Sequence, residues 1–160
     1  MIHILGDIPR RVAIAVSGGV DSMAVLDFLR RSREVTVLHY NHGTGAHADQ
    51  ATNLVREYCK KFALICTVGF NAEDIPTGVS SEAWWRQKRY TWFESTTDLP
   101  IITAHHLGDA VENWIFTSLN GNPFLIPRQR GQYLRPFLST EKSDFENWCE
   151  RKNVPFVIDP

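Results

Sequence analysis

The chain has 160 residues, a formal net charge of −1, 43% hydrophobic residues and 22% charged ones. This composition is ordinary for one globular domain and carries no overall nucleic-acid signature, so an RNA site has to be a local patch. There is no C-x-x-C pair, no signal pattern and no apolar run near the about 20 residues of a membrane span, so we expect a reduced cytoplasmic protein without membrane contact.

Apolar runs of strand length alternate with segments of helical spacing along the chain. We predict strands at residues 12–16, 35–40, 64–68 and 101–104, and helices at residues 23–31, 48–62, 81–93 and 109–119. Thr140 is expected to cap a last helix that Pro155 stops, before a final strand at 156–158. The alternation predicts an α/β fold, an open and mostly parallel twisted sheet with helices on both faces. Ligands of such sheets bind at the carboxyl ends of the strands.

A glycine-bearing turn follows the first predicted strand. It consists of Ser17, Gly18, Gly19, Val20, Asp21 and Ser22. The glycines allow a tight turn that can approach an anion, and the turn's backbone N–H groups and the helix N-terminus supply donors and positive partial charge. No lysine follows at the spacing of the G-x-x-x-x-G-K-[ST] loop, which excludes that motif. The turn predicts a phosphate site; the alternative is a plain helix cap by Asp21 or Ser22.

The second predicted strand leads into a polar segment, residues 39–43, with His47 further on. Three interpretations are open: a metal site, a loop that closes over adenine, and a polar surface loop. No cysteine or carboxylate set accompanies the histidines, so we favour the adenine loop, with His39 and Asn41 in the part whose backbone pairs with the base edge.

The third predicted helix carries Arg86 and Arg89, which share a face because they are three residues apart. They are either a solvated face beside an aromatic core stripe or a pair held over phosphate or a nucleic-acid backbone, for which guanidinium geometry is suited.

The fourth predicted strand is followed by two adjacent histidines, and then by Asp109 and Glu112 one helical turn apart. Such a cluster could hold Mg²⁺, orient an amine or shuttle protons. The alternative is a helix start with favourably placed acids.

In their order along the chain, these blocks resemble the N-terminal catalytic domain of the tRNA(Ile)-lysidine synthetase family. Residues 17–22 look like the PP-loop of N-type ATP pyrophosphatases, which split ATP between its α and β phosphates. The similarity runs from about residue 11 to residue 160 and includes the segments 134–138 and 158–160. It implies a Rossmann-like PP-loop fold and an enzyme that adenylates C2 of a tRNA cytidine, then joins L-lysine with release of AMP.

The resemblance also implies residue roles. The residues that would bind ATP are Ser17, Gly18, Gly19, Val20, Asp21, Ser22, His39 and Asn41. The catalytic residues would be His106, Asp109, Glu112 and Arg86. Mg²⁺ would be held by Asp21 and Asp109. The residues that would contact isoleucine tRNA are Arg89, Arg128, Arg130 and Arg135, the last three forming a compact basic patch.

The chain departs from the family at three points. Gly108 stands where the family usually has the first of two aspartates, and Asn113 stands where threonine is common. We expect one PP-loop domain over residues 1–160 without the family's C-terminal tRNA-binding domains, which makes RNA binding weak and salt-sensitive unless the protein forms a homodimer or has a helper. The alternatives are another PP-loop tRNA modifier such as a thiolase, and a non-catalytic relative that binds ATP or AMP and regulates a partner.

Overall fold

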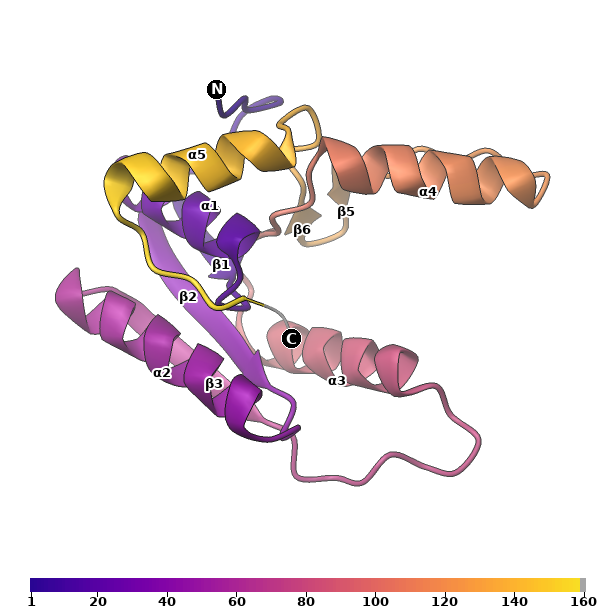
Figure 1. Ribbon diagram of the computed structural model, residues 1–160, viewed down its shortest axis with the longest axis horizontal. Helices are drawn as coiled ribbons and strands as arrows, with labels where there is room; N and C mark the ends of the chain where they lie inside the picture. The colour runs from indigo at the N-terminus through magenta and orange to yellow at the C-terminus, as the bar shows by residue number, and fades with distance from the viewer. Residues whose placement is uncertain (159–160) are drawn as a thin grey trace.

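A computed structural model describes residues 1–158 and shows five helices around a six-stranded sheet within that range (Figure 1). The strands are β1 (Arg11–Ala15), β2 (Glu34–Asn41), β3 (Ile65–Phe70), β4 (Ile101–Ile102), β5 (Gln129–Arg130) and β6 (Tyr133–Leu134). The helices are α1 (Val20–Arg30), α2 (Ala46–Lys61), α3 (Ser81–Thr96), α4 (Leu107–Leu119) and α5 (Lys142–Lys152). The predicted α/β class, with a mostly parallel sheet, is confirmed.

The strand order, β3-β2-β1-β4-β6-β5, places the switch point of the sheet beside β1. The chain runs outward from β1 through β2 to β3, then returns across the sheet to β4 on the other side of β1. Every pairing is parallel except the β5–β6 hairpin. The segments that follow β1 and β4 therefore lie next to each other at one edge of the sheet, where ligands of this fold bind.

Two apolar clusters cover the two faces of the sheet. Val12 and Ile14 of β1 point into the larger cluster, which they share with residues of α1, α2 and α5. Ala13, between them in sequence, points to the opposite face and packs in the smaller cluster with Phe93 of α3. This alternation is the period of two that a strand imposes, and it places helices on both faces as predicted.

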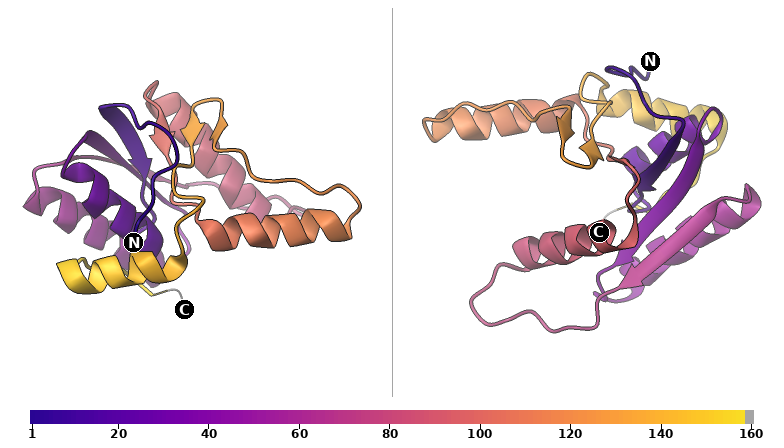
Figure 2. Two further views of the ribbon diagram at one scale, coloured as in Figure 1. Left: turned by 90° about the horizontal axis from the view of Figure 1, so that it is seen from above. Right: turned by 180° about the vertical axis from the view of Figure 1, so that it is seen from behind.

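The fourth helix projects from the body of the molecule (Figure 2). None of its residues is buried, and several apolar side chains are exposed, including Trp114, Ile115, Phe116 and Leu119. We call α4 with the returning segment 120–127 the arm. In the described part of the chain, no helix has the length and apolar character needed to cross a membrane.

The C-terminal predictions are partly wrong. Residues 156–158 form no strand; instead the Val157 N–H donates to the Gly18 carbonyl at 2.9 Å. The N-cap of α5 is Glu141, because the Thr140 hydroxyl is buried and bonds to the backbone of His3 at 2.8 and 2.9 Å. The helix ends at Asn153 in the left-handed conformation, before Pro155 is reached.

Other differences are shifts and omissions. The strand predicted at 101–104 is confined to β4, and the short β5 and β6 were not predicted. Helix α4 begins at Leu107 rather than at residue 109, with His106 as its N-cap. The end of the family-like segment 158–160, Asp159 and Pro160, lies outside the described residues.

Candidate active site

The turn after β1 is held in shape by its own hydroxyls. The Ser17 N–H donates to Ser22 Oγ at 3.1 Å, and the hydroxyl oxygens of these two serines lie 3.1 Å apart. Gly19 is the N-cap of α1, and no side chain caps this helix. The first N–H groups of α1 are therefore left for an anion, as the sequence predicts for a phosphate site.

Charged groups from three helices meet beside this turn. His106 Nε2 lies 3.5 Å from Asp21 Oδ2 of α1 and 3.5 Å from Asp109 Oδ2 of α4. Lys142, the first residue of α5, places its Nζ 3.3 Å from Asp21 Oδ2. The structure thus brings Asp21 together with His106 and Asp109, which lie far from it in the sequence.

A cavity of about 450 Å³, the strand-end cavity, opens where β1, β2 and β4 end. Residues from four of the segments predicted to be functional line this cavity. They include Ser17, Asp21, Asn41, Arg86, Arg89 and Asp109. Arg86 and Arg89 both line it, so the predicted shared face of α3 is directed at the cavity. An aromatic and histidine wall completes it, including Tyr40, His42 and Tyr90.

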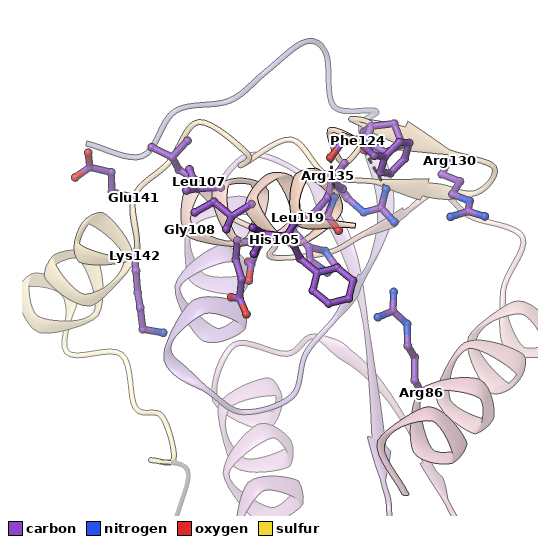
Figure 3. A pocket seen from close by; sticks show the side chains of 18 residues that line it. Arg86, His105, Leu107, Gly108, Leu119, Phe124, Arg130, Arg135, Glu141 and Lys142 are labelled. Carbon is purple, nitrogen blue, oxygen red and sulfur yellow. Dashed lines mark hydrogen bonds between the residues drawn. The ribbon is translucent and has the colours of Figure 1, made fainter. Parts of the chain in front are cut away.

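A larger cavity of about 1060 Å³, the arm cavity, lies between α4 and the body (Figure 3). Its outer part is apolar, with Ile115, Phe116 and Phe124. Its inner end carries charged side chains from separate elements, namely Arg86, Asp109, Glu112, Arg130, Arg135 and Lys142. Arg86, His105 and Asp109 line both cavities, which therefore share a wall.

The His39 side chain supports the loop structurally. Its Nδ1 donates to the Val16 carbonyl at 2.7 Å, and its Nε2 lies 2.9 Å from Thr52 Oγ1. Burial lowers the pKa of His39, so the ring stays neutral. Because both nitrogens are engaged, His39 is not available as a metal ligand, and within residues 1–158 no group of three His, Cys, Asp or Glu side chains is arranged for a metal.

Asn41 shapes the same loop. Its amide donates to Asp49 and Thr52, each at 3.0 Å, and its Oδ1 accepts from the Gly43 N–H at 2.8 Å. Beyond it, burial and the charge of Arg89 lower the pKa of His42 to about 4. The side chains of His39 and Asn41 are thus engaged within the protein, and the carbonyls of Asn41 and His42 accept hydrogen bonds from Asn71 at 2.9 and 3.3 Å.

The predicted patch of Arg128, Arg130 and Arg135 is not one patch. Arg130 and Arg135 line the arm cavity together with Arg86, but Arg128 donates to the carbonyls of Leu5 and Asp7 in the N-terminal segment. Arg135 is 8% exposed and donates to the Pro127 carbonyl. Burial, with the nearby charges of Arg130 and Arg86, lowers the pKa of Arg135.

Two contributors were missed by the sequence analysis. Lys142 is a lone lysine at a helix start, and no spacing rule links it to Asp21, which is 121 residues away. The segment at Val157 was predicted as a strand, although its backbone crosses the Gly18 turn. Only the family-like residues at the end of the chain gave a signal that this segment belongs to the site.

A phosphate-type turn at the switch point of a doubly wound sheet, with arginines, carboxylates and a lysine around it, defines a nucleotide-binding α/β protein. A family model described as a PP-loop domain matches residues 4–160, and the chain belongs to this PP-loop family.

Similar curated proteins are tRNA(Ile)-lysidine synthases. That of Malacoplasma penetrans (strain HF-2) is 35% identical over 162 residues, which cover 91% of this chain and 54% of the relative. Those of Staphylococcus aureus (strain COL) and Vibrio cholerae (El Tor, N16961) are 28% and 26% identical, with 39% and 38% of the relative covered. The chain thus spans about half or less of these relatives' length and matches their N-terminal domain.

Solved structures share the fold. The U34-tRNA thiolase NcsA from Methanococcus maripaludis, with its 4Fe–4S cluster, superposes with a TM-score of 0.75 at 13% identity, covering 96% of this chain and 61% of that one. The NH3-dependent NAD synthetase from Campylobacter jejuni gives a TM-score of 0.56 at 16% identity, covering 92% and 66%.

Proposed function

We propose that this chain is the catalytic unit of a tRNA(Ile)-lysidine-synthase-type ligase. It adenylates C2 of a tRNA cytidine with ATP, releases pyrophosphate, and joins L-lysine with release of AMP. The observation that carries the proposal is that Asp21, in the turn at 17–22, lies beside His106 and near Asp109 at the switch point of the sheet. The similarity to lysidine synthases over 91% of the chain supports the choice of acceptor.

ATP occupies the strand-end cavity in this proposal. The N–H groups of the turn and of the first turn of α1 hold the pyrophosphate, whose charge develops as it leaves. Lys142 adds a positive charge at the same place, 3.3 Å from Asp21. The adenine lies against the loop 39–43, whose backbone rather than whose side chains pairs with the base edge.

The carboxylates present fit Mg²⁺ held jointly with phosphate. Asp21 and Asp109 face one another across His106 Nε2, and both are partly exposed, at 26% and 37%. Mg²⁺ is commonly bound by one or two carboxylates plus substrate phosphates rather than by an all-protein cage. When bound, it neutralises charge on the leaving pyrophosphate.

The arm cavity takes the acceptor. Its apolar outer part suits a splayed base, and Arg86, Arg130 and Arg135 at its inner end suit the RNA phosphates. Asp109 and Glu112 supply the carboxylates that an incoming lysine ammonium requires. Since the two cavities share a wall, an α-phosphate in one lies beside a base in the other.

The test is incubation of the purified chain with α-labelled ATP, L-lysine and total tRNA, followed by mass spectrometry of the nucleosides. We expect lysidine, with AMP and pyrophosphate formed only when tRNA is present. A Ser17→Ala/Ser22→Ala double variant should lose AMP formation, and Ser118→Ala, an exposed change on the arm, should retain it. AMP formed equally without RNA, or ATP bound without any cleavage, contradicts the proposal; the latter outcome indicates a nucleotide-binding relative.

The thiolase alternative is not favoured by the cysteines. Cys59, Cys66 and Cys149 line neither the strand-end cavity nor the arm cavity. Thiolated nucleosides in the same experiment, with a sulfur donor added, would nonetheless reverse this preference.

A further inference from the structure

The His106 ring accepts a hydrogen bond at one nitrogen and places the other near two carboxylates. The Gly108 N–H donates to His106 Nδ1 at 3.0 Å, which makes the imidazole the N-cap acceptor of α4. An acceptor nitrogen carries a lone pair, so the proton of the neutral ring is on Nε2. Asp109 makes the reciprocal bond: its Oδ2 accepts a hydrogen bond from the His106 backbone N–H at 2.9 Å, which completes a capping box at the start of α4.

The Nε2 atom of that tautomer lies near two carboxylates, at ion-pair distance from each. Asp21 Oδ2 and Asp109 Oδ2 each lie 3.5 Å from Nε2. A donor placed near two anions offsets part of their mutual repulsion. The ring itself has little room to move, because it is 8% exposed and packs edge-on against the buried Phe145 at a centroid distance of 6.1 Å.

Gly108 is the residue that leaves space for this arrangement. A Cβ at position 108 would lie 2.8 Å from His106 Cε1 and 3.1 Å from His106 Nδ1. A side chain there requires the ring to shift from its observed position. Glycine at position 108 is therefore matched to the observed position of His106.

We propose that His106 is a positioning residue and that the observed position of its ring requires glycine at position 108. Its Nε2–H holds Asp21 and Asp109 in register, and its Nδ1 caps α4. In this tautomer neither nitrogen has a free lone pair, so the proton that the lysine ammonium loses before its amine attacks goes to another group. This inference rests on the proposed function only for its catalytic consequence; the tautomer and the steric role of Gly108 are properties of the chain alone.

The first test is spectroscopic and requires no substrate. Long-range ¹H–¹⁵N correlation spectra should show the His106 ring protonated at Nε2 and unprotonated at Nδ1. Gly108→Ala should abolish that signature. A glycine within a helix normally gains stability on change to alanine, but for Gly108, the second residue of α4, we expect a lower melting temperature. A ring protonated at Nδ1, or a Gly108→Ala protein that is more stable with an unchanged signature, overturns the proposal.

A matched pair of variants tests the roles of Nδ1 and Nε2 separately. His106→Asn keeps a cap acceptor near Nδ1 but lacks a donor at Nε2, whereas His106→Gln can place an amide N–H near Nε2 but loses the cap. We expect Gln to retain at least about tenfold more pyrophosphate release than Asn, and Asn to have the higher melting temperature. Equal activity of the two, or more activity in Asn, contradicts the positioning role. If the wild type itself releases no pyrophosphate, the proposed function fails and the spectra still decide this inference.

Discussion

Lys142 Nζ lies 3.3 Å from Asp21 Oδ2 and joins the first turn of α5 to the first turn of α1, where the phosphate-binding turn ends. Lys142 is 54% exposed, so this ion pair adds only about 0–1 kcal/mol to stability. We therefore predict that Lys142→Met weakens ATP binding by about tenfold, since a charged contact to phosphate is lost, and leaves the melting temperature nearly unchanged. Titration calorimetry and thermal unfolding measure the two effects.

Lys60→Met is the matched control for this prediction. Lys60 is exposed in the last turn of α2 and lines neither the strand-end cavity nor the arm cavity. ATP affinity should be the same in Lys60→Met as in the wild type. Equal affinities for all three proteins would show that Lys142 does not face the phosphates.

Gly18 has a backbone conformation that other residues rarely adopt, with φ at +94°, and an added Cβ would lie 3.2 Å from Ala51 Cβ. We predict that Gly18→Ala costs about 1–2 kcal/mol of stability and at least tenfold in ATP affinity, because the turn must move to relieve both constraints. Gly121→Ala carries the same kind of strain, with φ at +82° and open space around it, but lies at the tip of the arm. It should lose stability and keep ATP affinity; loss of affinity in both variants would mean that the effect is global.

The sequence predicted the sheet best where burial imposes a strict pattern. Val12–Ile14 and the alternating residues of β2 face two cores, so their apolar runs are unambiguous. The two-residue strands β5 and β6 are too short to produce a period, and α4 starts early because an imidazole serves as its cap in place of the usual Ser, Thr, Asp or Asn.

The site was predictable in its local parts and not in its long-range ones. The turn at 17–22 contains within itself the glycines and hydroxyls that define it. The contacts of Lys142 with Asp21 and of Val157 with Gly18 join segments more than a hundred residues apart, and no local pattern specifies such a partner. Proximity in sequence was also a poor guide to a shared site. Arg128 is close to Arg130 in the chain, but its guanidinium donates to carbonyls of the N-terminal segment instead of lining the arm cavity.

Asp27 is a buried carboxylate whose charge is stabilised by several donors. Burial favours its neutral form, but hydrogen bonds from Tyr58, Trp148, Arg31 and Arg30 outweigh that effect and lower the pKa of Asp27. Its contribution to stability is therefore fully present above the unfolded-state pKa of about 3.9, and it is lost as the pH falls through the lower folded-state pKa.

We predict that Asp27→Asn destabilises the protein by about 3 kcal/mol at pH 7 because it leaves Arg30, whose side chain is 17% exposed, without a carboxylate. The difference from the wild type should shrink below about pH 4, as the wild-type carboxyl is protonated. Urea unfolding at several pH values measures this. Asp98→Asn, an exposed change, should show neither effect; a constant difference down to pH 2 would rule out the charge of Asp27 as its source.

Cys66 is the cysteine whose thiol pKa is lowered. The neighbouring Cys59 thiol lowers the pKa of Cys66, although burial acts in the opposite direction. The Cys66 thiol and burial raise the pKa of Cys59, and burial near Asp27 raises the pKa of Cys149 to about 12. Since the thiolate is the nucleophile, iodoacetamide at pH 7 should modify Cys66 before it modifies Cys59 and Cys149.

Cys59→Ala removes the neighbouring thiol, so the pKa of Cys66 should return toward about 8.5 and its alkylation at pH 7 should slow by about tenfold. Peptide mass spectrometry over a time course measures the rate at each cysteine. Cys149→Ala is the control and should leave the Cys66 rate unchanged, because Cys149 is not among the groups that shift its pKa. An unchanged Cys66 rate in Cys59→Ala would mean that the low pKa has another origin, of which Arg56 is the next candidate, since its positive charge also lowers the pKa of Cys66.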